Sequence, residues 1–428
     1  TGNRQATTND RGFMVWNLGM DLQGNDMVLT KLTNWFADVY MFESIRAQTN
    51  AYTADRWYCY YKIVYQSNQI LDLIPDDVTG KALVYKAQAL TYRALAYYYL
   101  MCVYQDDYMH GGKDKAGVPL YLTVEGAKGR TPSTEVYSTI TTDLQNAIAL
   151  FEQEGYDPKS STADIDQTVA NMVLARVALT TGDYTTAANA AGAVISAGYS
   201  LMNEEQYTTS GFQSTSLPET IWGYTWAAST SLGNRSFASF MSITAVDNAN
   251  NKGIYMAIDD QLYNQIADTD YRKKNFNATE TTVGDFTYPA YSNVKFNTPT
   301  YEADEIYMRL SEAYLLKAEA EARGGNSSAA QQTLYDLVSK RDSGYAKSSN
   351  TGEALLKEIF LQSRIELWGE GHEFFTNKRF NVGVDRTASS NHTHKLVKAA
   401  GKEFTYQIPL SIELNSNPYI NAADQNPL

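Results

Sequence analysis

Two similar helical hairpins constrain the fold of this chain more than any other feature of its sequence. They occupy residues 170–197 and 303–341, where apolar and small side chains recur every three or four residues, as on one face of a helix. Each hairpin bends at a glycine, a residue that accepts the backbone angles at which helices end. The two copies match in register at four pairs of positions: Ala175 with Ala318, Gly182 with Gly325, Ala187 with Ala330, and Val194 with Leu337. This agreement indicates an internal repeat.

One hairpin of this kind cannot bury its own apolar face, so several copies have to stack. Small inward-facing residues and a Gly-Asn pair at the bend, Gly325 and Asn326, are typical of tetratricopeptide repeats. Asn326 or Ser327 is predicted to cap the second helix of that copy. We therefore predict a mainly α fold in which the repeat is a scaffold and the functional residues lie elsewhere.

Further helices are predicted from the same periodicity at residues 55–74, 81–104, 135–152 and 351–369. Thr131 and Pro132 precede the third of these, and this pair predicts a helix start with Thr131 as the N-terminal cap. The last segment, residues 404–428, contains Pro409, Pro418 and Pro427, so we expect it to be extended and to wrap around the rest of the protein.

Residues 198–302 differ from the helical parts on either side. Helical periodicity weakens there, while Gly, Asn, Ser, Thr and aromatic residues become more frequent. Short strands are plausible at residues 221–226 and 293–296. Long loops carried on a rigid scaffold are where binding sites tend to lie, so this irregular insertion is predicted to face the ligand.

Net charge and aromatic content limit the classes of molecule that this protein is expected to bind. The net charge of −13 argues against nucleic acid and anionic membrane surfaces. The chain contains 32 Tyr and 6 Trp, which suit both helix packing and stacking on carbohydrate. Its two cysteines, Cys59 and Cys102, fall in predicted helices at a spacing that is marginal for a bond, so two free thiols are expected. The longest apolar run, residues 94–104, is too short to span a bilayer.

The first candidate ligand residues lie in the predicted strand at residues 221–226. Alternation would place Trp222, Tyr224 and Trp226 on one face, where the rings could stack on the C–H faces of sugar rings. The alternative is that this face packs on the helices, which is the more natural interpretation for Trp222 because aromatic residues dominate protein cores. Tyr224 and Trp226 therefore remain as candidates.

Two further aromatic pairs are candidates. Asn34 and Trp35 would combine a stacking ring with an amide that can bond neighbouring sugar hydroxyls, or the segment could simply pack against the protein. Tyr288 and Tyr291 flank Pro289 and would form a rigid aromatic pair in a loop. Their alternative is a loop packed into the helical bundle.

Residues that could carry catalysis or bind a metal have more ordinary interpretations. Glu366, Glu370 and Glu373 follow helical spacing, and carboxylates on one helix surface cannot flank a sugar as glycosidic cleavage requires. Ion pairs with Arg364, Lys378 or Arg379 are predicted for them instead. His392 and His394 could in principle bind a metal, but only four histidines occur and a solvated loop is expected. The chain has no nucleotide-binding loop or nucleophile elbow, and we predict neither an enzyme nor a cofactor nor a metal site.

Short motifs spread along the chain resemble, in their order, the SusD/RagB family of outer-membrane nutrient-binding lipoproteins of gut-type Bacteroidetes. The matching stretches are Trp57-Tyr58, Asn68 to Leu71, Ala87 to Tyr99 with Arg93-Ala94, Gly117 to Leu120, Arg130 to Pro132, Asp143-Leu144, Leu174 to Arg176, Gly182 to Tyr184, Asp268 to Arg272, Lys295-Phe296, Arg309, Ala318 to Ala320, Arg364 to Leu367, Gly369 to Gly371, Lys378-Arg379, Ile408-Pro409, Glu413-Leu414 and Asn426-Pro427.

The resemblance implies a right-handed bundle of four tetratricopeptide-like units with a less regular region laid across it. It also implies capture of oligosaccharides or polysaccharides at the cell surface, beside a SusC-like TonB-dependent outer-membrane transporter. On this basis we predict one domain over residues 1–428, comprising N-terminal helical repeats (42–197), the irregular ligand-facing insertion (198–302), C-terminal helical repeats (303–380) and a wrapping tail (381–428).

The sequence departs from the family pattern at its start. The lipid-bearing cysteine of the family is not seen here, because Cys59 and Cys102 both fall in helices, and no signal peptide is visible. We expect the lipid anchor that would hold the protein on the outer membrane to lie outside this chain. The family's glycan contacts lie in variable loops, so no site residue transfers by motif. The remaining alternatives are an all-helical glycoside hydrolase and a repeat scaffold that binds only protein.

Overall fold

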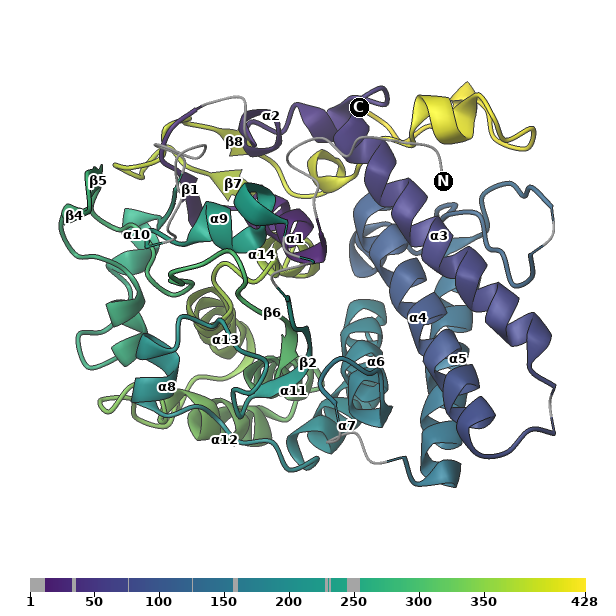
Figure 1. Cartoon of the computed structure of the whole chain (residues 1–428), viewed down its shortest axis with the longest axis horizontal. Coiled ribbons are helices and arrows are strands. Elements are labelled where there is room, and N and C mark those ends of the chain that lie inside the picture. The colour runs from purple at the N-terminus through teal and green to yellow at the C-terminus, as the bar shows by residue number, and fades with distance from the viewer. Residues whose placement is uncertain are drawn as a thin grey trace. The chain divides into compact units, whose positions relative to one another are not determined.

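The computed structural model describes residues 12–32, 36–75, 77–124, 126–156, 161–227, 230, 232–244 and 255–428. Contacts divide the chain into two compact units (Figure 1). Unit 1 contains the described parts of residues 1–43 and 198–398, and unit 2 contains those of residues 44–197 and 399–428. Each unit is therefore built from segments that are far apart in the sequence.

Unit 2 is mainly helical. Its helices are α3 (Ala51–Leu73), α4 (Lys81–Tyr104), α5 (Ser133–Glu154), α6 (Gln167–Thr181) and α7 (Tyr184–Ile195), and each packs on the next in sequence order. Figure 1 shows α3, α4 and α5 side by side. Small or branched apolar residues fill the contacts between these helices, for example Ala94 of α4 and Ile140 of α5, both fully buried. A bidentate ion pair from Arg93 to Asp143, with two bonds of 2.7 Å, also links α4 to α5.

Unit 1 combines helices with short antiparallel strand pairs. Its helices are α1 (Phe13–Asp21), α2 (Ala37–Tyr40), α8 (Glu204–Thr209), α9 (Phe237–Met241), α10 (Asp260–Tyr263), α11 (Leu310–Arg323), α12 (Ser327–Val338), α13 (Gly352–Glu366) and α14 (Glu373–Arg379). Its strands pair as β1 (Met27–Leu29) with β3 (Met256–Ile258), β2 (Thr220–Tyr224) with β6 (Glu305–Arg309), β4 (Thr281–Val283) with β5 (Phe286–Tyr288), and β7 (Val384–Asp385) with β8 (Val397–Lys398).

The structure confirms the internal repeat. One copy is the pair α6 and α7, and the other is the pair α11 and α12. The bend glycines Gly182 and Gly325 have φ angles of 83° and 85°, which L side chains rarely adopt. The next residues, Asp183 and Asn326, cap the second helix of each copy by accepting a backbone N–H. The four matched alanines, at positions 175, 187, 318 and 330, are all fully buried between their helices.

Several predicted boundaries differ from the structure. The segment 303–341 begins with strand β6, because Ile306 and Met308 are buried beside β2 before the helical pattern starts at Leu310. The N-cap residue of α5 is Pro132 and not the predicted Thr131. Residues 293–296 do not form a strand, because Asn293 makes only an isolated bridge and residues 295–296 form a turn. The last segment is mostly extended and packs within unit 2, but it also contains a π-helical turn at Leu410–Leu414.

Cys59 and Cys102 are not joined in a disulfide bond, and both are half-buried. Among the described residues, no helix combines the length and the apolar character needed to cross a membrane.

Candidate ligand-binding site

The predicted site residues do not come together in one place. Asn34 and Trp35 lie outside the described residues, so the structure leaves that prediction as it stands. Tyr288 is only 2% exposed, and its ring packs edge-on against Tyr255 at 4.8 Å between centroids. Tyr291 is partly buried, with φ at 70°, and its ring lies 5.0 Å from that of Tyr263. The expectation of an open aromatic pair is thus wrong for Tyr288, because the loop packs into the protein.

Tyr224 and Trp226 do form an aromatic pair at the end of β2. Their ring centroids are 4.8 Å apart and their planes meet at 72°, so the two rings make a corner and not a flat platform. Tyr224 is 40% exposed and Trp226 is half-buried. Trp222 does not join them, since it is 8% exposed and packs against Tyr307. The strand ends at Tyr224, and register shifts in β2 break the alternation that the sequence suggested.

Polar groups that the sequence did not single out lie close to this corner along the chain. The Thr215 hydroxyl lies 3.0 Å from the Thr225 hydroxyl and 3.0 Å from Oδ2 of Asp304. Thr225, which lies between Tyr224 and Trp226 in the sequence, is exposed. A hydroxyl can donate and accept hydrogen bonds to a hydroxylated ligand, and a carboxylate can accept them. Their pairing depends on the β2–β6 contact, which no short sequence motif signals.

Glu305 lies behind the corner, opposite Tyr224 in the β2–β6 pair. It is 3% exposed, and the Tyr307 hydroxyl donates to Oε2 at 3.1 Å, whereas Oε1 has no hydrogen-bond partner among the described residues. Burial raises the pKa of Glu305 to about 7, against the lowering effects of the Tyr307 hydroxyl and the nearby Trp226 indole. The corner therefore rests on a carboxyl group that titrates near neutral pH.

This pKa predicts a pH-dependent effect of Glu305→Gln on stability. Because the folded pKa is above the ordinary value of 4.5, the folded state keeps a proton that the unfolded state releases, and stability falls as pH rises toward 7. Glutamine carries no charge to bury. Urea unfolding measures the free energy of unfolding of the variant minus that of the natural protein, and this difference should be about 2 to 3 kcal/mol larger at pH 8 than at pH 4.5. The same difference at both pH values would contradict the raised pKa of Glu305.

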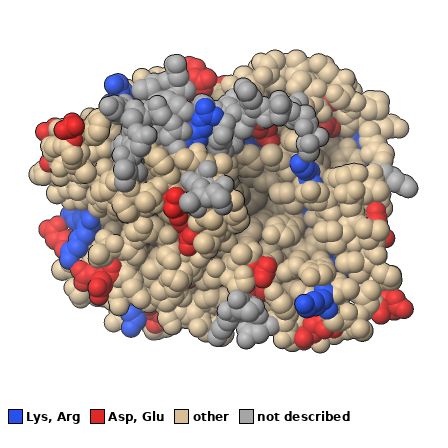
Figure 2. Space-filling model, in the orientation of Figure 1, with Lys and Arg blue, Asp and Glu red and all other residues tan. Residues whose placement is uncertain are grey.

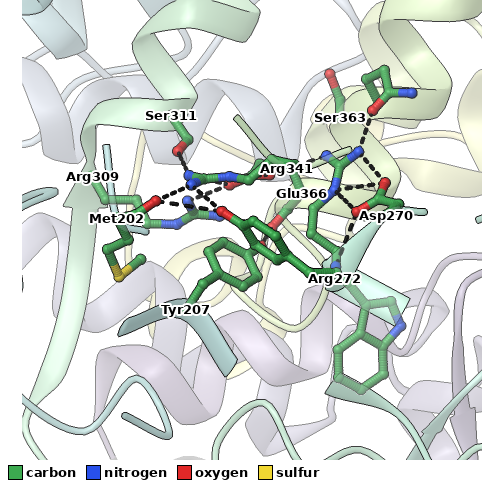
Figure 3. Close-up of polar contacts among 12 residues, drawn as sticks. Met202, Tyr207, Asp270, Arg272, Arg309, Ser311, Arg341, Ser363 and Glu366 are labelled. Carbon is green, nitrogen blue, oxygen red and sulfur yellow. Dashed lines mark hydrogen bonds and ion pairs between the residues drawn. The ribbon is translucent and has the colours of Figure 1, made fainter. Parts of the chain in front are cut away.

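A buried network of ion pairs holds β6 in place (Figure 3). It contains four cationic side chains, Arg272, Lys295, Arg309 and Arg341, and four carboxylates, Glu219, Asp270, Glu366 and Glu370. All eight are buried, and their formal charges cancel. Because Arg309 ends β6 and Glu219 directly precedes β2, the network fixes the strand pair that carries the aromatic corner.

Glu366 is the hub of this network. Its Oε1 accepts from Arg309 at 2.7 Å and from Arg341 at 3.1 Å, and its Oε2 accepts from Arg272 at 3.1 Å. Burial by itself would raise the pKa of Glu366, but the three guanidinium groups outweigh it and hold the pKa well below the ordinary value. The guanidinium of Arg341 also lies over the ring of Tyr207, 4.6 Å from its centroid.

The structure confirms ion pairing for Glu366 and Glu370 but with other partners than those predicted. The cations that bind them come from the 3₁₀ helix η6 (Tyr271–Asn275), from the turn that contains Lys295, from β6 and from the segment after α12. Arg364 instead pairs with Asp26, and Arg379 with Glu319. The two glutamates also do not share a helix, because α13 ends at Glu366. Partners so distant in sequence cannot be read from helical spacing.

The predicted histidine loop is also partly wrong. His392 is 5% exposed, and its Nε2 lies 2.8 Å from the Asn25 carbonyl oxygen. Burial lowers the pKa of His392 to about 3, so the ring is neutral at physiological pH. Among the described residues, no cluster of three or more His, Cys, Asp or Glu side chains is placed to hold a metal ion.

Comparison with known proteins identifies the family. The SusD family model matches residues 220–417, and a second model, described as starch-binding associating with outer membrane, matches residues 10–179. Together the two matches include most of the chain and overlap nowhere. Among curated proteins, no sequence matches this chain.

Solved structures show the same fold. A SusD-like carbohydrate binding protein from Bacteroides vulgatus is 24% identical, with a TM-score of 0.84 over 100% of this chain and 95% of that one. A SusD superfamily protein from Bacteroides thetaiotaomicron is 22% identical, with a TM-score of 0.81 over 99% and 96%. Surface glycan-binding protein A from Bacteroides uniformis is 18% identical, with a TM-score of 0.71 over 96% and 93%. With two family models matched along its length and this shared helical-repeat fold, the chain belongs to the SusD-like family.

Proposed function

We propose that this protein binds a neutral oligosaccharide or polysaccharide at the corner formed by Tyr224 and Trp226. The observation that carries the proposal is a partly exposed aromatic corner in a chain of the SusD-like family. Aromatic rings contact the apolar C–H faces of sugars, while groups such as Thr225 and Asp304 bond their hydroxyls. The names of the solved relatives, a carbohydrate binding protein and a surface glycan-binding protein, support this ligand class.

The surface charge also suits a neutral ligand. Figure 2 shows one face of the molecule, on which the described Lys, Arg, Asp and Glu side chains lie in small scattered groups among uncharged residues. On this face (Figure 2), therefore, no broad patch of one sign is seen that would favour a polyanion or a polycation. Recognition would then depend on ring contacts and on a few hydrogen bonds.

The proposed role is holding the glycan without cleaving it. Glycosidic cleavage uses two carboxyl groups that face each other across the scissile bond. At the corner, Asp304 and Glu305 are neighbours in sequence, and Glu305 is buried behind the rings. Glu366 and Glu370 are held in ion pairs inside unit 1. A glycoside hydrolase therefore remains the less supported alternative.

We propose a cellular role that is consistent with the family: the protein works on the extracellular face of the outer membrane, held by a lipid anchor, and delivers glycan to a SusC-like TonB-dependent transporter. The description of the second family model, associating with outer membrane, supports the location. Asn34 and Trp35 remain proposed additional glycan contacts. A scaffold that binds only protein is the other alternative.

Affinity electrophoresis in gels containing soluble polysaccharides tests the site. Removing the larger ring with Trp226→Ala should weaken binding to the retaining polysaccharide by about tenfold, because ring contacts of this kind are worth roughly 1 kcal/mol or slightly more. Tyr224→Ala should have a smaller effect in the same direction. Tyr85→Ala, which removes an exposed tyrosine of α4, serves as the control and should migrate like the natural protein. Unchanged retention of both corner variants would contradict the assigned site.

A further inference from the structure

Unit 2 contains a second aromatic pocket that the candidate site does not include. It has a volume of about 270 Å³ and lies between α3, the loop that follows Leu120, and the π-helical turn at Leu410–Leu414. All of its lining residues belong to unit 2. These segments are distant in sequence, so the pocket is a product of the fold.

One wall of the pocket is an aromatic stripe on α3. The stripe consists of Trp57, Tyr58, Tyr61 and Tyr65, which spacings of three, four and seven residues place near one another on the helix. Tyr58 is 45% exposed and Tyr65 is 50% exposed, so two large rings of this stripe remain open to solvent. Single exposed rings are common on protein surfaces, but two exposed rings that line the same pocket form the kind of apolar patch that marks binding surfaces.

The rings of the pocket are held in fixed orientations. Trp57 contacts Tyr61 with 5.0 Å between centroids, and Tyr61 meets the ring of Tyr121 edge-on at 5.7 Å. The Tyr61 hydroxyl donates to the Pro119 carbonyl oxygen at 2.8 Å. Asn68 pins the loop by donating to the carbonyl oxygens of Tyr121 and Thr123. The pocket is thus formed before any ligand arrives, which lowers the entropic cost of binding.

Glu413 supplies the charged polar group of the pocket. It is 9% exposed and accepts one hydrogen bond on each carboxylate oxygen, from the Trp57 indole at 3.1 Å and from the Asn417 amide at 2.6 Å. A carboxylate can accept about four bonds, so each oxygen retains room for another donor. Burial raises the pKa of Glu413, which is consistent with a partly desolvated carboxyl that would gain from a further donor.

We propose that this pocket is a second glycan subsite, which binds one sugar residue of a neutral oligosaccharide. Sugar C–H faces would stack on Tyr58 and Tyr65, and a ring hydroxyl would donate to Glu413. The described lining contains this carboxylate and no Lys or Arg, so anionic sugars and phosphates are disfavoured. The volume suits a single ring better than a long segment.

A proline-rich peptide is the main competing occupant, since such peptides also dock on aromatic grooves. The pocket favours a sugar for one reason. Glu413 can accept further hydrogen bonds, and proline has no backbone N–H to donate to it, whereas every sugar hydroxyl is a donor. The proposal shares its ligand class with the proposed function but does not depend on the corner at Tyr224 and Trp226.

Titration calorimetry with the whole chain tests the subsite. The probes are neutral trisaccharides built from glucose, xylose, mannose or galactose, and a hexaproline peptide. Tyr65→Ala should weaken binding of the best trisaccharide to this pocket by about tenfold, and Tyr58→Ala should act similarly. Tyr85→Ala, which removes a tyrosine of 55% exposure from α4, is the matched control and should leave binding unchanged.

A doubled variant separates the two sites. In a protein that carries Trp226→Ala and Tyr224→Ala, trisaccharide binding that Tyr65→Ala still weakens by about tenfold would support the pocket on its own, even if the corner binds nothing. Trisaccharide binding that survives both Tyr58→Ala and Tyr65→Ala in that background would overturn the proposal. Binding of hexaproline but of no trisaccharide in the same background, lost on Tyr65→Ala, would also overturn it and assign the pocket to a peptide.

Discussion

Replacing Glu366 with glutamine is expected to lower the free energy of unfolding by about 3 to 5 kcal/mol. Glu366 is fully buried and accepts hydrogen bonds from three guanidinium groups, those of Arg272, Arg309 and Arg341. The substitution keeps the shape of the side chain but leaves one positive charge uncompensated inside unit 1. It also turns an amide N–H₂ toward N–H donors, so at least one hydrogen bond is lost. Urea unfolding followed by circular dichroism measures the effect.

The matched control for this prediction is an exposed glutamate that also pairs with a cation. Glu353 of α13 pairs with Lys357 at 3.0 Å, and both side chains are largely exposed. Because solvent screens such pairs, Glu353→Gln should change the free energy of unfolding by less than about 0.5 kcal/mol. Equal effects of the two substitutions would mean that the buried network does not hold unit 1 together.

The second large effect is expected for Gly371→Ala, which should cost about 2 to 5 kcal/mol of unfolding free energy. Gly371 has a φ angle of 86°, where an alanine is strained by about 1 to 2 kcal/mol. A Cβ atom there would also lie 2.2 Å from Cβ of Asn17 and 2.8 Å from its Cα, so α1 would have to shift. Overpacking of this kind adds about 1 to 3 kcal/mol.

The variant Gly325→Ala separates backbone strain from overpacking. It has nearly the same φ angle, 85°, but a Cβ atom built on it meets nothing within 4 Å. Gly325→Ala should therefore show only the backbone strain, about 1 to 2 kcal/mol. Thermal and urea unfolding of both variants give the comparison. A cost for Gly371→Ala no greater than that for Gly325→Ala would show that the close approach of Asn17 is not part of the stable fold.

The repeat was the part of the fold that the sequence predicted best. Helical spacing, a glycine at the bend and a capping Asp or Asn are local signals, and they correctly located the turns at Gly182 and Gly325. The pair α3 and α4 was predicted within a few residues for the same reason. Local residues decide where such helices begin and end, so the helix ends can be predicted without knowing the long-range contacts.

The irregular part of unit 1 was predicted less well, because long-range contacts decide its structure. The strand at Thr220–Tyr224 exists because β6 pairs with it along its length, whereas Asn293 forms only an isolated bridge with Phe276 before a turn at residues 295–296. The exposure of Tyr224 and the burial of Tyr288 are equally set by neighbours distant in sequence. Spacing on one helix likewise could not reveal that Glu366 binds Arg309 and Arg341.

The pocket of unit 2 could be predicted only in part from the sequence. The stripe of Trp57, Tyr58, Tyr61 and Tyr65 is visible in the sequence as aromatic residues at helical spacing. Such a stripe is usually buried against another helix, and only the structure shows that Tyr58 and Tyr65 stay exposed. Glu413 follows α3 by hundreds of residues, so its contact with Trp57 could not be predicted.

Calorimetric titration of the protein with soluble polysaccharides, paired with a reducing-sugar assay of the same mixtures, tests the central claim most directly. The account predicts saturable heat of binding with at least one neutral polysaccharide and no reducing ends above the level of a protein-free sample. Release of reducing sugar would show that the protein is an enzyme. Absence of binding to every glycan, with tight binding to a protein partner instead, would contradict the account just as firmly.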